Sequence, residues 1–334
     1  MSERPSFSHR RVFVGFALSL LAAAGAAIYL YVAYIRYDRV AALHLPQGTA
    51  AALRLDLEKV VLYEPVRRHL LPLANELPPG RSGAQVPART RLERVQSATG
   101  IELGVDLREL VLGWGPGPAD WVLIVGGRFP RTGVLDGLQR VLGEEGAVWH
   151  RSSDGAALIS QGGIALGQAV DGTLIAASNE ASLRAALPLT DTHQRLELPT
   201  EGPGGFALQG DRVRALIPVP LRLLVPPLRV VDDIEHVHGD LALGPEVVLS
   251  TQLRLQSATA EQVVQQLQQL SQNARRLAAL PGVPAGPVQA AERLAAEVNG
   301  PQEVRVTASW TRDEVDAAAR ELAGVLRTLF GWAS

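Results

Sequence analysis

Hydrophobic and polar positions divide the chain into one long apolar run followed by many short periodic segments. Residues 12–35 read VFVGFALSLLAAAGAAIYLYVAYI and contain no charged side chain. The hydrocarbon core of a bilayer is about 30 Å thick, and a helix needs about 20 apolar residues to cross it. We therefore expect residues 12–35 to form a transmembrane helix that contacts the lipid bilayer.

Charged and aromatic residues at the two ends of this run predict its orientation. Arg10 and Arg11 precede it, and three tyrosines lie near its far end, where amphipathic rings favour the headgroup layer. We expect a cytoplasmic tail, 1–11, in a single-pass protein of the inner membrane whose C-terminal domain is periplasmic. The alternative is a signal peptide cleaved at the small residues 22–26. Because the apolar run continues beyond them, an uncleaved anchor is favoured.

The periodicity after residue 40 changes repeatedly between strand-like and helix-like. Residues 50–55 alternate as a strand does, and Asp56 offers a cap for the helix that comes next. A hairpin over 106–129, a helix over 131–143 and an antiparallel meander of short β-runs come after it. Asn179 then caps a short helix. These elements form a first module, 40–190.

The same order of strand, helix, hairpin and helix occurs again, more loosely, in a second module, 200–334. A strand over 204–211 and a hairpin over 232–256 are followed by a helix over 259–280. We further expect a helix near 287–298, a strand over 303–310 and a helix over 312–329. Thr259 with Gln262 and Thr311 with Glu314 have the spacing of capping boxes. The fold class predicted is α+β: an N-terminal transmembrane helix, then two loosely repeated modules with antiparallel sheets covered by helices.

Composition and charge exclude several classes of function. The chain contains no cysteine, so disulfides, thiolate nucleophiles and zinc–thiolate sites are excluded. Five basic and two acidic side chains in residues 1–39 leave the remainder with a net charge of −5, given −2 overall. Nucleic acid is not an expected partner, because its binding needs a positive surface.

Several segments of the first module carry a resemblance to known proteins. They are LPQGTAAALRLDL (45–57), TGIELGVDLRELVLG (99–113), GGRF (126–129) and DGTLIAASNEASLRAAL (171–187). Together with the N-terminal anchor, this part of the chain, 45–187, resembles uncharacterised bacterial envelope proteins whose ectodomain is a domain of unknown function. The resemblance implies an exported, membrane-tethered α+β domain. It implies no catalytic residues.

One polar cluster offers metal-ligating side chains. His236 and His238 are two residues apart on a predicted strand, so both imidazoles lie on one face, and Asp232 and Glu235 add carboxylates nearby. This spacing is consistent with a metal site, and so with a metal-dependent hydrolase. The polar side of a half-solvated hairpin explains the same spacing. Because the spacing alone is a weak signal for a metal, we favour this second interpretation.

A second unusual segment is LIPVPLRLLVPPLRVV (216–231), in which four prolines interrupt an apolar stretch. Leu221, Leu223, Leu224 and Val225 are candidates to line a groove for an apolar ligand, a lipid or an envelope partner. The interpretation that the sequence favours is a buried connector between a helix and a hairpin, because large exposed apolar patches are uncommon. From these features we expect a non-catalytic binding or interaction module, with no cofactor. The hydrolase and the apolar-ligand protein are its alternatives.

Overall fold

The computed structural model describes residues 37–75, 91–117, 119–144, 146–217, 219–224, 226–278 and 293–329. The predicted anchor at 12–35 and the predicted loop at 77–90 lie outside this part of the chain. No helix within the described part is both long enough and apolar enough to cross a membrane. Residues from Arg39 onward form one compact unit.

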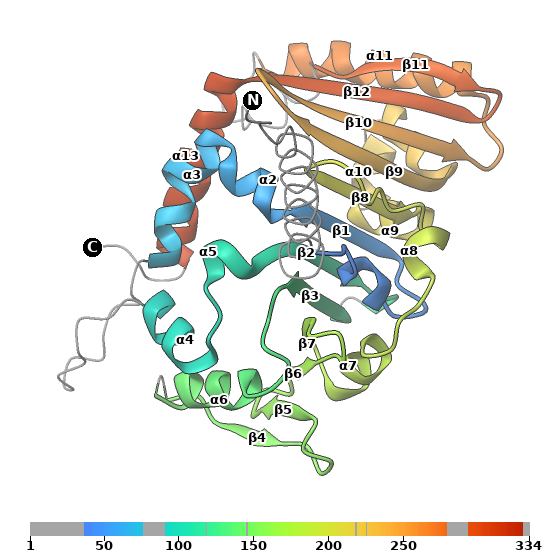
Figure 1. Cartoon of the computed structure of the whole chain (residues 1–334). Coiled ribbons are helices and arrows are strands. Elements are labelled where there is room, and N and C mark those ends of the chain that lie inside the picture. Colours follow the sequence, from blue (N-terminus) through green and yellow to red (C-terminus); the bar gives the residue numbers. More distant parts are fainter. Residues whose placement is uncertain are drawn as a thin grey trace, which may run out of the picture. The chain divides into compact units, whose positions relative to one another are not determined.

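Within the described residues, twelve strands form one continuous sheet in the order β11-β12-β10-β9-β8-β1-β2-β3-β7-β6-β5-β4 (Figure 1), and every neighbouring pair is antiparallel. The strands are β1 (Ala51–Asp56), β2 (Leu107–Trp114), β3 (Trp121–Gly127), β4 (Trp149–Arg151), β5 (Ala157–Ser160), β6 (Ala165–Gln168), β7 (Leu174–Ala177), β8 (Gly204–Gln209), β9 (Ile234–Leu243), β10 (Glu246–Leu255), β11 (Ala295–Gly300) and β12 (Glu303–Thr311).

Helices connect these strands at their ends or cover the faces of the sheet. The α-helices are α2 (Leu57–Leu62), α3 (Glu64–His69), α4 (Arg91–Thr99), α5 (Leu103–Asp106), α6 (Val134–Glu144), α7 (Glu180–Ala186), α8 (Thr192–Arg195), α9 (Gly210–Leu216), α10 (Val219–Leu224), α11 (Ala260–Ala278) and α13 (Arg312–Leu329). The part of the chain that the structure describes also contains three 3₁₀ helices, η2 (Ala41–His44), η3 (Leu71–Asn75) and η4 (Pro226–Asp232).

The two halves of the chain meet where β1 pairs with β8, with Ala52 opposite Ala207. Strands β1 to β7 lie on one side of this pairing and β8 to β12 on the other. Each half begins with a strand, continues through helices into a hairpin, β2–β3 or β9–β10, and reaches a longer helix, α6 or α11. The predicted α+β class with antiparallel strands and helices is confirmed. The sequence did not predict that both halves share a single sheet.

Local signals in the sequence account for the starts of several helices. The Asp56 carboxylate accepts a hydrogen bond from the Lys59 amide at the start of α2, and the Asn179 side chain accepts one from the Ser182 amide at α7. At α13 the Glu314 carboxylate accepts from the Thr311 amide at 2.8 Å. Each bond satisfies an amide that the first helical turn leaves unpaired. These predicted caps are confirmed.

One predicted helix is wrong. The alanine-rich segment near 287–298 favours a helix by composition, but its described C-terminal part belongs to strand β11. This strand forms a tight hairpin with β12 through a turn at Pro301 and Gln302. The Gly300-Pro301 pair is a turn signal, and pairing with β12 outweighs the helix propensity of the alanines.

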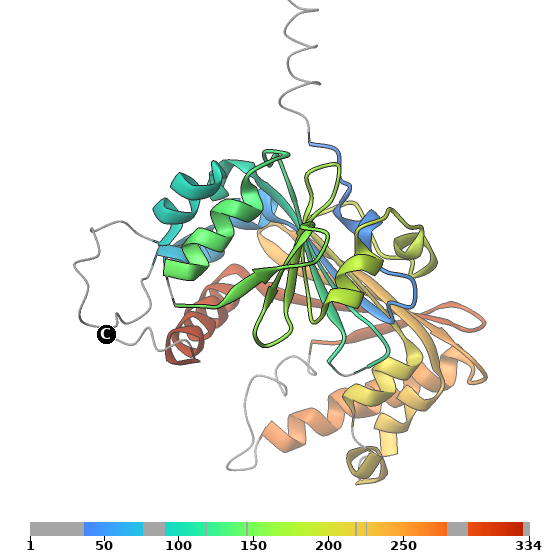
Figure 2. The ribbon, with the colours of Figure 1, turned by 90° about the horizontal axis from the view of Figure 1, so that it is seen from below.

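Successive side chains of β1 point to opposite faces of the sheet. We call the face that carries Arg54 the Arg54 face and the face that carries Leu53 the Leu53 face. In the first half, η2 and α7 pack on the Arg54 face over Val111, Ile124 and Ile175. Helix α6 packs on the Leu53 face, where Val134 lies among Val125 and Leu174. Figure 2 shows α6 and α7 on opposite sides of the strands between them.

In the second half, the Leu53 face carries the larger core. Val237, Leu253 and Val304 on the strands pack against Val263 of α11 and Val230 of η4. No comparable apolar cluster is found on the Arg54 face of this half within the described residues. Its strands instead present polar side chains there.

At one end of the strands, α3 and α13 lie side by side (Figure 1). Asp316 of α13 joins them, because its carboxylate lies 3.0 Å from His69 Nε2 and 3.2 Å from Arg68 Nη1. Arg312 also pairs with Glu64. Helix α13 comes after the last strand of the second half, so this contact ties it to the first half.

A buried ion pair lies near the junction of the halves. Arg54 on β1 and Glu109 on β2 are 0% and 1% exposed, and the Arg54 Nε donates to the Glu109 carboxylate at 2.6 Å. The other Glu109 oxygen accepts from the Ala41 amide at 3.2 Å. Arg54 Nη1 donates to the Gly202 carbonyl at 3.4 Å, so the guanidinium contacts the connection into β8. Removing both charges from water is compensated only while the pair is intact.

We expect Glu109→Gln to lower the free energy of unfolding by about 3–5 kcal/mol, because it leaves the guanidinium buried without a counter-ion. The double variant Arg54→Met with Glu109→Leu removes both charges. It should cost only about 1 kcal/mol, mainly for the lost acceptor of the Ala41 amide. Denaturant unfolding followed by tryptophan fluorescence measures both. Equal destabilisation of the single and double variants would contradict this account.

A second polar link holds η2 to the first half. The buried His44 ring lies between two oxygen acceptors, with Nδ1 2.9 Å from the Ala186 carbonyl and Nε2 3.0 Å from an Asp171 carboxylate oxygen. Burial alone would raise the pKa of Asp171, but hydrogen bonds from His44 and from Thr173 outweigh it and hold this pKa below its ordinary value. The ionised carboxylate is therefore the form that stabilises the fold.

Because the pKa of Asp171 is lowered in the folded chain, its contribution is present above the ordinary pKa of 3.8 and is lost as the pH falls through the folded-state pKa. We expect Asp171→Asn to lower the free energy of unfolding by about 1 kcal/mol at neutral pH. The difference between wild type and variant should shrink in acid. Unfolding curves at about pH 7 and about pH 3 test this, and a difference that grows in acid would exclude it.

Candidate functional site

The Leu53 face of strands β1 to β3 is apolar and only half-buried. Successive strands place Leu53, Leu112 and Leu123 side by side, and Trp114 lies opposite Trp121. We call this surface the apolar sheet face. It consists of Leu53, Leu55, Leu110, Leu112, Trp114, Trp121 and Leu123, all half-buried.

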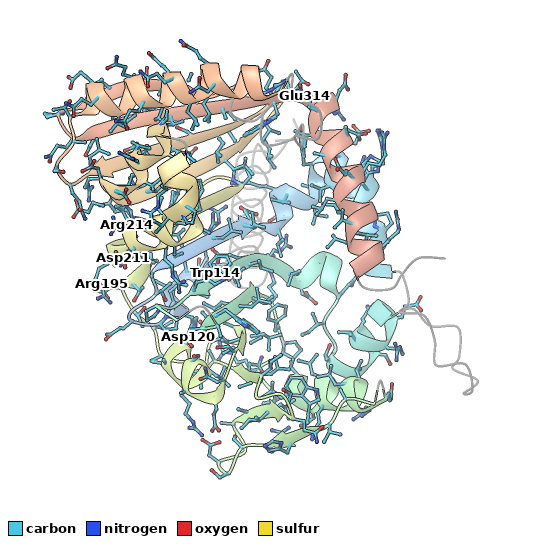
Figure 3. The ribbon with its side chains drawn as sticks, turned by 180° about the vertical axis from the view of Figure 1, so that it is seen from behind. Trp114, Asp120, Arg195, Asp211, Arg214 and Glu314 are labelled. Atoms are coloured by element: carbon cyan, nitrogen blue, oxygen red, sulfur yellow. The ribbon has the colours of Figure 1, made fainter. Side chains whose placement is uncertain are left out.

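The described helices surround the apolar sheet face without packing over its middle. Helices α2 and α5, which contact β1 and β2, are the sequence neighbours of these strands, whereas η2 and α7 lie on the Arg54 face. In Figure 3, Trp114 lies on the strands between α9 and α10 (yellow) and α6 (green). The Arg212 side chain of α9 donates to the Gly117 carbonyl at 2.8 Å, which holds α9 beside the β2–β3 turn.

The helix that carries most of the predicted groove residues lies on the same side of the sheet as this surface. Leu221, Leu223 and Leu224 belong to α10, which packs against η4 on the side of the sheet that carries the apolar sheet face. Val225 lies outside the described residues. Two apolar neighbours are strongly exposed, Leu216 at 70% and Val219 at 56%. Leu216 and Val219 thus present apolar side chains to solvent.

A second cluster lies on the polar Arg54 face of the second half. His236 and His238 are two residues apart on β9, so their side chains are on the same face, and their ring centroids are 5.5 Å apart. A Glu197 carboxylate oxygen lies 3.3 Å from His238 Nδ1 and 3.9 Å from His236 Nδ1. One ligand atom from each of these three residues lies within 4.8 Å of the others. We call these residues the Glu197–histidine cluster.

The connection from α8 to β8 places Glu197. Leu196 and Leu198 on either side of it are 2% and 5% exposed and belong to the core of the first half. Between these two anchors Glu197 adopts a φ of 51°, the only positive φ of a non-glycine residue within the described chain. This left-handed conformation costs an ordinary L-residue about 1–2 kcal/mol, so the packing of the two leucines maintains it.

Electrostatics at this cluster favour an ionised Glu197 and a neutral His236. Burial alone would raise the pKa of Glu197, but the Arg254 guanidinium, at 2.9 and 3.2 Å from its two oxygens, outweighs it and lowers the pKa. Burial lowers the pKa of His236, and Glu197 opposes this only in part. His236 is 8% exposed, and neither ring nitrogen makes a hydrogen bond of ordinary geometry among the described residues, although the backbone carbonyl of Leu196 faces the ring.

The structure brings together two of the four metal candidates that the sequence suggested. Asp232 lies in η4, where it pairs with Arg222, and Glu235 is exposed on the opposite side of β9 from the histidines. Sequence reasoning missed Glu197, which comes from a connection far before the strand. The only local signal is a glutamate between two leucines, and it does not indicate a partner on β9.

Comparisons with known proteins give little additional information. No family model matches the chain, and no curated protein matches it. Among solved structures, crystal forms I and III of TP0453 align over 88% of this chain and 99% of theirs. Both are 10% identical, with TM-scores of 0.44 and 0.45. Alignments this loose carry no inference about the fold or the function of the chain.

Proposed function

We propose that the chain is a membrane-tethered, extracytoplasmic binding protein that is not an enzyme and that takes a lipid acyl chain on its apolar sheet face. The observation that carries the proposal is the run of leucines and tryptophans on one face of β1 to β3, all of which remain only half-buried although α2 and α5 contact these strands. A soluble domain rarely leaves a contiguous apolar surface of this kind without an occupant.

The dimensions of the surface suit an elongated apolar group. Three neighbouring strands span about 10 Å across the sheet, and the residues from Leu110 to Trp114 extend about 14 Å along it. An acyl chain laid on such a surface removes apolar area from water on both partners, at about 25 cal/mol per Å². The tryptophan pair supplies flat, rigid contact area.

The predicted anchor would place the folded unit at the membrane. A transmembrane helix over 12–35 with a cytoplasmic tail at 1–11 would hold the α+β unit next to the bilayer, where lipid is the most abundant apolar ligand. The apolar sheet face then belongs to the first of the two repeated modules, 40–190, and α9 of the second, 200–334, lies beside the β2–β3 turn. An envelope protein with an apolar segment remains the alternative occupant of the same surface.

We expect a photo-crosslinking side chain in place of Leu112 to capture lipid in intact cells, with an adduct mass that mass spectrometry assigns to a phospholipid or fatty acid. The matched control is Leu189, which is 62% exposed and belongs to neither the sheet nor the apolar sheet face. A crosslinker there should give no lipid adduct. A protein adduct from Leu112 would favour the envelope-protein alternative, and equal lipid capture at both positions would refute the proposed site.

The topology has its own test. A C-terminal tag on the full chain should stay with the membrane fraction and should be removed by protease added to intact spheroplasts, because the anchor places the folded unit outside the cytoplasm. A protected tag would place the unit in the cytoplasm. A soluble, shortened and accessible product would show that the N-terminal segment is cleaved.

A further inference from the structure

The Glu197–histidine cluster has the donor set of a metal site. Imidazole nitrogen and carboxylate oxygen are ligands that Zn²⁺ accepts at about 2.0–2.2 Å, which places neighbouring ligand atoms of a tetrahedral site about 3.3–3.5 Å apart. The 3.3 Å between His238 Nδ1 and a Glu197 oxygen matches this spacing. The 3.9 Å to His236 Nδ1 is longer by an amount that small side-chain rotations absorb.

The buried imidazole of His236 is a second and independent observation. Its two ring nitrogens are out of contact with water, and neither makes a hydrogen bond of ordinary geometry among the described residues, although the backbone carbonyl of Leu196 faces the ring. An unsatisfied buried polar group costs about 1–3 kcal/mol, so native proteins usually supply a partner or an ion. A metal ion between Glu197, His236 and His238 supplies a partner for one of these two nitrogens.

The scaffold holds all three side chains firmly. Strand β9 is hydrogen-bonded on both sides, with His238 opposite Ala207 of β8 and Gln252 of β10. Two residues apart on this strand, the histidines are presented in the same direction. Glu197 is fixed by its two buried leucine neighbours. Ligands on rigid strands keep their geometry better than ligands on free loops.

Arg254 modulates the site. Its Nη2 lies 2.9 Å from Glu197 Oε1 and 3.2 Å from Oε2, and Oε2 is the oxygen that faces the histidines. The arginine therefore orients the carboxylate, as hydrogen-bond partners of metal-binding carboxylates do. Its positive charge also repels a cation, so the affinity should be lower than in a closed site with four ligands.

We propose that Glu197, His236 and His238 bind one divalent transition-metal ion, best matched by Zn²⁺, in an open site with three protein ligands. Two imidazoles and one carboxylate favour zinc over magnesium or calcium, which prefer oxygen ligands. The site lies on the opposite side of the sheet from the apolar sheet face, so it stands independently of the proposed lipid binding. Asp232 and Glu235 take no part in it.

The test uses the full chain, purified in detergent through a tag without histidine and stripped with a chelator. Equilibrium dialysis against Zn²⁺ should load one ion per chain, whereas Mg²⁺ should not load. His236→Gln, His238→Gln and Glu197→Gln should each weaken Zn²⁺ binding by at least about tenfold, since loss of even an outer partner of a metal ligand costs about 10–100-fold. The matched controls Asp232→Asn and Glu235→Gln should bind as the wild type does.

A thermal melt separates lost binding from lost folding. Zn²⁺ should raise the Tm of the wild type and of both controls, because the ion binds only the folded chain. The three ligand variants should melt cooperatively without this shift. Absence of Zn²⁺ uptake by the wild type, unchanged binding in the ligand variants, or an equal loss in the two controls would each overturn the proposal.

Discussion

The buried pair of Arg54 and Glu109 is the interaction on which the centre of this fold depends. Strand β1 is hydrogen-bonded to β2 of its own half and to β8 of the other half, and Arg54 reaches from it to Glu109 and to Gly202. Two charges at this depth are tolerated only in one arrangement, since any shift leaves an uncompensated ion. The pair thus favours one register of β1 on β2, and Arg54 also contacts the connection into β8, while the apolar clusters on either side supply most of the stability.

The two faces of the sheet carry different kinds of surface, one apolar and one polar. In the first half the strongest packing is on the Arg54 face, which leaves the Leu53 face of β1 to β3 half-buried and apolar. In the second half the core lies on the Leu53 face, and the Arg54 face is left to histidine, arginine and glutamate side chains. An apolar surface and a polar cluster therefore lie on opposite sides of one scaffold. Function is better argued from these surfaces than from the fold.

Features set by neighbours in sequence were predictable, and features set by distant partners were not. Asp56, Asn179 and Glu314 act within one helical turn, so their spacing was sufficient to predict the caps. The alternation around Arg54 does not reveal that this arginine is buried, because the carboxylate that accompanies it into the core is on another strand. Glu197 was missed for the same reason. Two buried leucines, Leu196 and Leu198, hold Glu197 in place. Its histidine neighbours are on β9, which pairs with β8, the strand that follows Glu197 in the chain.

A sheet of twelve strands that does not close must end somewhere, and open sheets of this size are uncommon. One end is β4, only three residues long, with His150 and Arg151 exposed. The other is β11, which carries the exposed Glu297 and a bulge in its pairing with β12. Short, charged and bulged edges resist the addition of further strands from neighbouring molecules. Even when many copies crowd together, the sheet is thereby protected from growing into fibrils, and its faces stay available for recognition.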